Sequence, residues 1–126
     1  MPFVAVTDIG LLQSVTWSDV KQNGDYLETD FFKMVADPRT DKALIEQISP
    51  ARHGDKVKIP VMLTMGGDDV RVPEIHGARF YSAVKDSGGK IEYKVYTGEG
   101  HGFNKDANVF DFYKRMEKFF AENLKK

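Results

Sequence analysis

The chain has 126 residues, with 18 Lys and Arg against 19 Asp and Glu, 41% hydrophobic residues and no cysteine. This composition indicates one soluble globular domain and excludes collagen, disulfide scaffolds and thiol chemistry. The absence of cysteine fits a reducing or an oxidising compartment, and we expect a cytoplasmic protein. The net charge of −1 provides no basic face for nucleic acid or for a membrane surface. No apolar run reaches the roughly eighteen residues that a membrane span needs.

The first half of the chain predicts one strand followed by short helices. Residues 3–6 form a β-prone apolar run, which we expect to be a strand buried on both faces. Residues 7–49 carry turn signals at Gly10, Asn23-Gly24 and Asp37-Pro38, with weak helical spacing near 26–31 and 44–48. These signals predict short helices joined by loops.

The second half predicts two strands that alternate with two helices. Strands are expected at 59–65 and 91–96, and helices at 74–86 and 108–124. Pro73 would open the first helix and Gly88-Gly89 would end it. Its expected apolar stripe is Ile75, Ala78, Tyr81 and Val84; that of the last helix is Phe112, Met116, Phe119, Phe120 and Leu124. This order predicts an α/β fold with about three parallel strands and flanking helices.

Two loops at the carboxyl ends of expected strands carry residues suited to catalysis. Asp68 and Asp69 follow the second strand, and His101 stands between Gly100 and Gly102 after the third. Neighbouring parallel strands bring such loops together, and a carboxylate that orients a histidine is the base half of a nucleophilic triad. The glycines would let the backbone turn sharply beside the ring. The plainer alternatives are a turn or helix N-cap for the acidic pair and an ordinary loop position for the histidine.

The other two histidines have no such setting. We expect His53 in a polar surface loop and His76 on the exterior of a helix. No two histidines stand three to five residues apart with a carboxylate, and no glycine-rich phosphate loop is present. The sequence therefore predicts neither a metal site nor a cofactor.

A serine nucleophile is not recognisable in this sequence. In α/β hydrolases that serine lies in a G-x-S-x-G turn between a strand and a helix, ahead of the acid and the base. None of the serines has this context: Ser14, Ser18, Ser49, Ser82 and Ser87.

Four segments together resemble a known enzyme family. They are Ile48-Ser49-Pro50, Ile59-Pro60-Val61-Met62-Leu63, Gly66-Gly67-Asp68-Asp69-Val70-Arg71-Val72-Pro73 and Gly98-Glu99-Gly100-His101-Gly102-Phe103. Their order and spacing resemble the carboxyl-terminal third of the catalytic domain of the prolyl oligopeptidase (S9) family of serine peptidases, an α/β-hydrolase fold. The most similar members are bacterial acylaminoacyl- or dipeptidyl-peptidase-like enzymes.

The resemblance implies a role for individual residues. Asp69 stands two residues before Arg71 and four before Pro73, as the triad acid does in the family's D-x-x-V-P stretch; Asp68 is the second choice. His101 resembles the triad base. Arg71 occupies the position from which some members reach a substrate carbonyl.

The resemblance also implies that residues 1–126 are a single, incomplete α/β-hydrolase domain. The family's nucleophile and oxyanion-hole donors would precede Met1. We therefore expect a fragment that hydrolyses nothing by itself, from a parent enzyme that cleaves peptide or acyl-peptide bonds.

Two alternatives to an inactive fragment remain. An exposed strand edge near residues 3–6 would make the chain a subunit or interaction module, which forms a homo-oligomer or pairs with a complementary chain. The chain would otherwise be a small hydrolase with an unrecognised nucleophile, such as Ser14 or Thr7.

Overall fold

The computed structural model describes residues 4–14 and 32–124. Its helices and strands, in chain order, are α1 Ile9–Ser14, α4 Phe32–Met34, α5 Lys42–Ile48, the 3-10 helices η2 Pro50–Arg52 and η3 Gly54–Lys56, β1 Val61–Gly66, α6 Ile75–Asp86, β2 Ile91–Tyr96 and α7 Asp106–Asn123. The prediction of short helices before residue 49 is confirmed for α1, α4 and α5. Gly10 lies inside α1 and not in a turn. The turn expected at Asn23-Gly24 and the helical spacing near 26–31 lie outside the described residues.

The described sheet contains two parallel strands. β1 pairs with β2 from Val61 opposite Ile91 to Gly66 opposite Tyr96, which confirms the second and third predicted strands and their direction. The described part of the third expected strand, residues 4–6, is not in a strand. Val4 has a φ of 49°, outside the β region, and its N–H makes one bond to the Thr64 carbonyl oxygen at 3.1 Å.

The segment after Val4 also differs from the prediction of a strand buried on both faces. Val6 is 36% exposed, whereas the polar side chains of Thr7 and Asp8 are buried. The apolar run alone does not decide this, because burial on both faces needs helices packed on each side of the segment.

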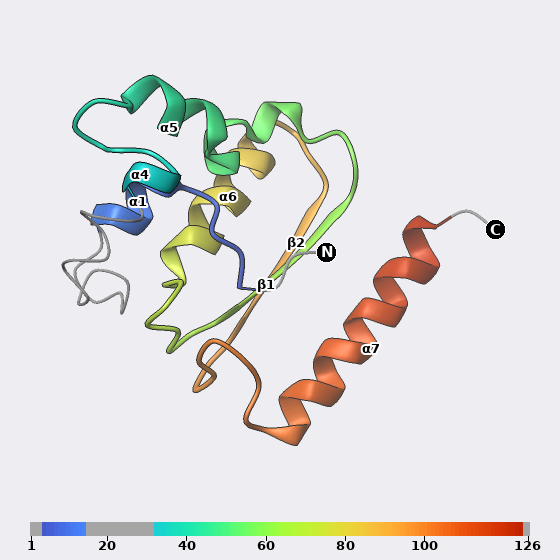
Figure 1. Ribbon diagram of the computed structural model, residues 1–126. Helices are drawn as coiled ribbons and strands as arrows, with labels where there is room; N and C mark the ends of the chain where they lie inside the picture. The colour runs from blue at the N-terminus through green and yellow to red at the C-terminus, as the bar shows by residue number, and fades with distance from the viewer. Residues whose placement is uncertain (1–3, 15–31, 125–126) are drawn as a thin grey trace.

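Helices α6 and α7 cover opposite faces of the sheet (Figure 1). The face towards α6 holds one hydrophobic cluster: Leu63, Met65, Val72, Phe80, Val84 and Ile91. The face towards α7 holds a second cluster: Met62, Tyr96, Phe112 and Phe119. This alternation along β1 is the period of two that a strand imposes, and burial of these side chains stabilises both layers.

The buried face of α6 is rotated from the predicted stripe. Its buried residues are His76, Gly77, Phe80 and Val84. Ile75 and Val84 are nine residues apart, which is about 180° around a helix of 3.6 residues per turn, so they cannot share one face. The helix ends where it was expected, because the Gly88 and Gly89 N–H groups donate to the Lys85 and Val84 carbonyls.

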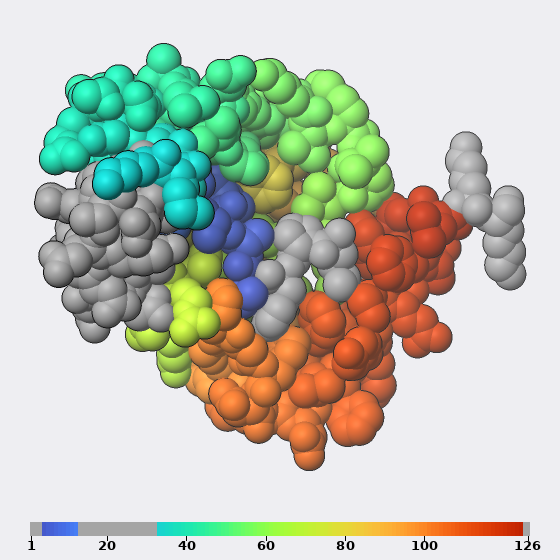
Figure 2. Space-filling model, viewed as in Figure 1, coloured from blue at the N-terminus to red at the C-terminus, as the bar shows by residue number. Residues whose placement is uncertain are grey.

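Only part of the predicted face of α7 is buried. Phe112 and Phe119, two turns apart, are buried and Met116 packs against them. Phe120 is 39% exposed and Leu124 is 66% exposed, so the prediction is wrong at both positions. Phe120 is rotated about 100° from Phe119, away from the sheet. In Figure 2, α7 forms one side of the molecule.

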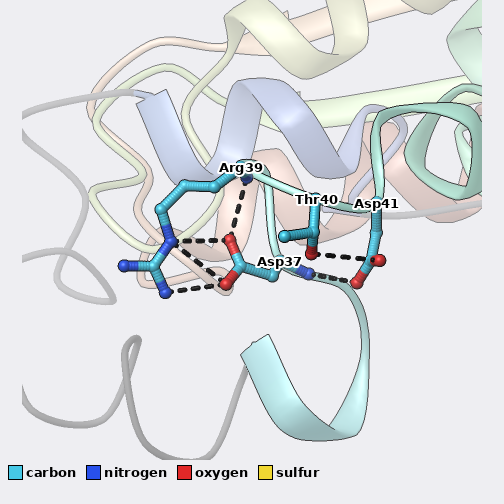
Figure 3. A network of polar contacts seen from close by, with 4 residues as sticks. All are labelled: Asp37, Arg39, Thr40 and Asp41. Atoms are coloured by element: carbon cyan, nitrogen blue, oxygen red, sulfur yellow. Dashed lines mark hydrogen bonds and ion pairs between the residues drawn. The ribbon is translucent and has the colours of Figure 1, made fainter.

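The turn between α4 and α5 is closed by polar contacts (Figure 3). The Asp37 carboxylate accepts bonds from the Arg39 backbone N–H at 2.8 Å and from its guanidinium at 2.7 Å. The hydrogen bond from the Arg39 side chain is the main reason why the pKa of Asp37 lies below its usual value. The Asp37 N–H in turn donates to Asp41 at 2.9 Å, so the turn predicted at Asp37-Pro38 is confirmed.

None of the helices in the part of the chain that the structure describes is long and apolar enough to cross a membrane.

Candidate active site

Asp69 is fixed by the loop that follows β1, which we call the Asp loop (residues 67–74). Its Oδ1 accepts the backbone N–H groups of Arg71 and Val72, both at 2.9 Å. Such bonds to the second and third following residues are typical of aspartate in turns. They hold the carboxylate in one orientation, with its side chain completely buried.

His101 meets the other oxygen of this carboxylate. Its Nδ1 lies 2.9 Å from Asp69 Oδ2. An ionised carboxylate only accepts hydrogen bonds, so this contact fits a ring that carries a proton on Nδ1, and in that tautomer Nε2 can accept a proton. The His101 side chain is 37% exposed, against 0% for that of Asp69. The acid is therefore shielded while the ring faces the solvent.

The neighbouring carboxylate of Asp68 takes no part in this pair. Asp68 is exposed, and its backbone N–H donates to the Glu99 carbonyl oxygen at 2.9 Å. Among the side chains that the structure describes, Asp69 is the one hydrogen-bonded to the His101 ring. Of the two candidates that follow β1, the geometry thus pairs Asp69 with the histidine.

The backbone joins the Asp loop to the loop that carries His101, which we call the His loop (residues 97–105). The Gly67 N–H donates to the Tyr96 carbonyl at 3.0 Å, which extends the β1–β2 pairing beyond the strands. Gly66 lies so close to the His loop that a Cβ there would be 2.1 Å from the Gly100 carbonyl oxygen. Any side chain at this position would force the two loops apart.

Within the His loop, the left-handed position is Gly98, with a φ of 76°. Gly100 and Gly102, on either side of the histidine, are not left-handed, and each has room for a Cβ. The sharp turn lies three residues before the histidine, where the chain leaves β2.

Glu99 is a buried acid in the His loop that sequence reasoning missed. Its side chain is fully buried and accepts three bonds: from the Asn104 N–H at 2.7 Å, the Lys105 N–H at 3.1 Å and Asn108 Nδ2 at 2.6 Å. The Asn108 bond is the main reason why the pKa of Glu99 lies below its usual value, and the two backbone bonds add to it. A glutamate between two glycines gives no local sign of burial.

Of the remaining candidates, Thr7 makes its hydrogen bond elsewhere, whereas Arg71 adjoins Asp69. The Thr7 hydroxyl is buried and donates to the His76 carbonyl oxygen at 2.6 Å, so its proton is not directed at the His101 ring. The side chain of Ser14 lies outside the described residues. Arg71 is exposed beside Asp69. A pocket of about 370 Å³ opens along the Asp loop, lined by Gly67, Asp68, Asp69, Val70, Pro73, Glu74 and Ile75.

We expected His76 on the exterior of α6, and this is wrong. The residue is fully buried. The face of α6 that packs against the sheet includes His76, because His76 lies one turn before Phe80 on the same side of the helix. Burial lowers the pKa of His76, opposed by the charges of Asp8 and Asp69 and reinforced by that of Arg79. Neither ring nitrogen has a hydrogen-bond partner within the described residues.

His53 is half-buried beside η2, and its Nε2 lies 3.1 Å from the Gln47 carbonyl oxygen. Within residues 4–14 and 32–124, no three His, Cys, Asp or Glu side chains gather in a way that could hold a metal ion.

Comparison with known proteins finds one family, and relatives within it, that the sequence matches. The sequence model of a protein family described as the prolyl oligopeptidase family matches residues 4–126 of this chain. Dipeptidyl aminopeptidase BIII of Pseudoxanthomonas mexicana is 31% identical over 94 residues, which are 73% of this chain and 14% of that protein. Acylamino-acid-releasing enzyme 2 of Oryza sativa is 31% identical over 81 residues, which are 64% of this chain and 10% of the enzyme.

Solved structures share the fold. A puromycin-hydrolyzing peptidase of Mycobacterium tuberculosis superposes with a TM-score of 0.83 at 24% identity, over 97% of this chain and 18% of that one. The Pyrococcus horikoshii acylaminoacyl peptidase gives 0.79 at 24% identity, over 98% of this chain and 20% of its own. The chain thus spans a fifth or less of each of these relatives.

Proposed function

Because the chain belongs to the prolyl oligopeptidase family, we propose that it supplies the acid and the base of a serine peptidase, Asp69 and His101, and that residues 1–126 are the carboxyl-terminal part of an α/β-hydrolase domain. The observation that carries this proposal is the 2.9 Å contact between His101 Nδ1 and the buried Asp69 carboxylate. The relatives' names, acylamino-acid-releasing enzyme and dipeptidyl aminopeptidase, support peptide or acyl-peptide bonds as the substrate.

In this proposal the chemistry passes through Nε2 of His101. Nε2 takes the proton from a serine hydroxyl as the serine oxygen bonds to the substrate carbonyl carbon. The imidazolium then gives this proton to the leaving amine nitrogen as the C–N bond breaks. Asp69 keeps the ring in the Nδ1–H tautomer and stabilises the imidazolium. In the second half of the reaction Nε2 takes a proton from water as the water oxygen bonds to the acyl carbon. The imidazolium then returns the proton to the serine oxygen as the ester bond breaks and the acid product leaves.

The nucleophile and the oxyanion-hole donors come, in this proposal, from outside this sequence. None of its serines lies in a G-x-S-x-G turn. A base without a nucleophile and without donors for the developing oxyanion gives no useful rate. In this proposal Arg71, which is exposed beside Asp69, binds a substrate carbonyl.

A first experiment tests the chain by itself. We expect no labelling by a fluorophosphonate probe and no hydrolysis of an activated acyl-peptide ester. His101→Ala should leave this background rate unchanged. Turnover that His101→Ala abolishes would show that the chain holds its own nucleophile, and would overturn the proposal that the nucleophile comes from elsewhere.

A second experiment tests the two catalytic residues. Residues 4–124 would replace the matching segment of the M. tuberculosis peptidase, which superposes over 97% of this chain, and puromycin hydrolysis would be measured. We expect Asp69→Asn to lower kcat by about 10⁴-fold and His101→Ala by about 10⁶-fold. Asp68→Asn is the matched control and should have little effect. A folded, active chimera that tolerates both changes would refute the assignment.

We propose association through the edge of β1 as a second role of the chain. Within the described residues, the outer edge of β1 receives one backbone bond, that from Val4 to Thr64. An edge with unpaired N–H and C=O groups is a template for a strand of another chain.

A further inference from the structure

Glu99 is a buried acid of the His loop that takes no part in the proposed reaction. Its side chain is fully buried, two residues before His101. Burying a carboxylate costs free energy unless donors surround it. Here three donors do so, and all of them follow His101 in the chain: the N–H groups of Asn104 and Lys105 and the Asn108 amide.

These bonds close the His loop on itself. Glu99 lies before the histidine, Asn104 and Lys105 lie after it, and Asn108 belongs to the first turn of α7. The carboxylate thus ties both ends of the segment that carries His101 to the start of the helix. The negative charge also lies at the amino-terminal end of α7, where the helix dipole favours it.

The backbone of Glu99 is tied to the other half of the site. Its carbonyl oxygen accepts the Asp68 N–H at 2.9 Å, one residue before the acid that holds the His101 ring. Glu99 therefore joins three parts of the molecule: the Asp loop through its backbone, and the His loop and α7 through its side chain.

We propose that Glu99 is the positioning residue of the His101 base, which it acts on through the His loop without touching the ring. This inference rests on the proposed function, in which His101 acts as the base. Without the Glu99 carboxylate, residues on either side of the segment from 100 to 103 would keep the longer bond from Lys105 Nζ to the Thr97 carbonyl oxygen, at 3.4 Å. We expect this bond alone to hold the segment less firmly, so that Nδ1 of His101 would leave Asp69 for part of the time.

The chemistry requires a carboxylate and not an amide at this position. Each oxygen of Glu99 faces a backbone N–H: Oε2 that of Asn104 and Oε1 that of Lys105. In Glu99→Gln the side chain keeps its size, but one of its two terminal atoms becomes an NH₂ group. Whichever way the amide turns, this group meets a backbone donor, and that bond is lost.

The test is a nuclear magnetic resonance measurement on the chain itself, which reads the tautomer and the proton exchange of the His101 ring. In the unchanged chain we expect the Nδ1–H form. Glu99→Gln should give a mixture of both tautomers and about tenfold faster exchange of the Nδ1 proton, as the loss of ordinary hydrogen bonds produces. Asn108→Ala removes one donor and should give a smaller change of the same kind.

Asp111→Asn is the matched control. Asp111 also links α7 to β2, through Tyr96 at 3.0 Å, but it makes no bond to the His loop. It should lower stability and leave the ring spectrum unchanged. The proposal is wrong if Glu99→Gln lowers the urea midpoint without changing the tautomer, or if Asp111→Asn alters the ring equally. If Glu99→Gln does not fold, Asn108→Ala decides by the same signature.

Failure of this inference is distinguishable from failure of the proposed function. The ring spectrum reports how His101 is held whether or not it acts as a base, whereas the puromycin assay of the chimera reports the base itself. An intact spectrum with an inactive site would leave the positioning role standing and remove the catalytic one.

Discussion

Asp68 and Asp69 are adjacent, yet they have opposite environments. Asp69 turns inwards, where two backbone N–H groups and the His101 ring use both its oxygens, and Asp68 stays in solvent. Strand-end position alone predicts the pair and cannot choose within it, because both residues follow β1. The D-x-x-V-P resemblance selects Asp69 as the proposed triad acid, and Asp69 is also the carboxylate that contacts His101.

His76 predicts a pH dependence of stability at the residue scale. Its pKa in the folded chain lies below the ordinary value of 6.5, mainly because the ring is buried. Below pH 6.5 the unfolded chain therefore binds a proton that the folded chain does not. His76 therefore does not reduce the free energy of unfolding above pH 6.5. As the pH decreases from 6.5 towards the folded-state pKa, the free energy of unfolding falls by at most about 1.4 kcal/mol per pH unit.

Urea unfolding between pH 7.5 and 5.5 measures this effect. His76→Leu should flatten the dependence in this range, and His53→Gln, at a half-buried histidine, should keep it. Glu99 affects stability in a lower pH range. Its pKa in the folded chain lies below the ordinary value of 4.5, so the stability that it contributes is lost only as the pH falls below 4.5. An unchanged slope in His76→Leu would contradict the prediction.

At the scale of elements, the site depends on how closely the end of β1 approaches the His loop. In Gly66→Ala the new methyl group would lie 2.1 Å from the Gly100 carbonyl oxygen and 2.6 Å from that of Glu99. Both are backbone atoms, so the loops must separate. We expect a loss of about 1–3 kcal/mol in the free energy of unfolding and a loss of the Nδ1–H signature of His101.

The control for this change lies in the same loop. A Cβ at Gly102 would have no neighbour within 4 Å, so Gly102→Ala should keep both the stability and the ring spectrum. Equal effects of the two substitutions would show that the close approach of the loops is not what holds the pair together.

Helix α7 offers a second test at the same scale, since two of its four phenylalanines, Phe110 and Phe112, differ in burial. Phe112 belongs to the cluster with Met62 and Tyr96, whereas Phe110 is 67% exposed. We expect Phe112→Ala to cost about 3–5 kcal/mol in the free energy of unfolding. Phe110→Ala should change it by less than about 0.5 kcal/mol. Chemical denaturation measures both, and similar costs would mean that α7 packs by its other face.

For the whole molecule, the outer edge of β1, which receives one backbone bond from the described residues, predicts self-association. The Thr64 carbonyl points to this edge, where it meets Val4, and so do the N–H groups of Thr64 and Met62. Light scattering should show a mass that rises with concentration. Hydrogen exchange at Met62 and Thr64 should slow with it, while that at Leu63, whose N–H faces β2, should not change. A constant monomer mass would contradict the prediction.

The positions of β1, β2, α6 and α7, and of the two loops that follow the strands, could be predicted from the sequence by itself. Short β-prone runs, helical spacing, Pro73 and Gly88-Gly89 specify these elements locally, because each depends on the backbone geometry of a few neighbouring residues. The meeting of the Asp and His loops follows from parallel strands whose carboxyl ends share one edge.

Which faces are buried was decided only by the tertiary structure. The burial of His76 and Glu99, the exposure of Phe120 and the non-strand conformation of residues 4–6 all differ from local expectation or give no local sign. Burial depends on what packs against a residue, and those contacts come from segments distant in the chain. Glu99 is the clearest case, because its carboxylate is tolerable in the interior only where the fold brings three donors to it.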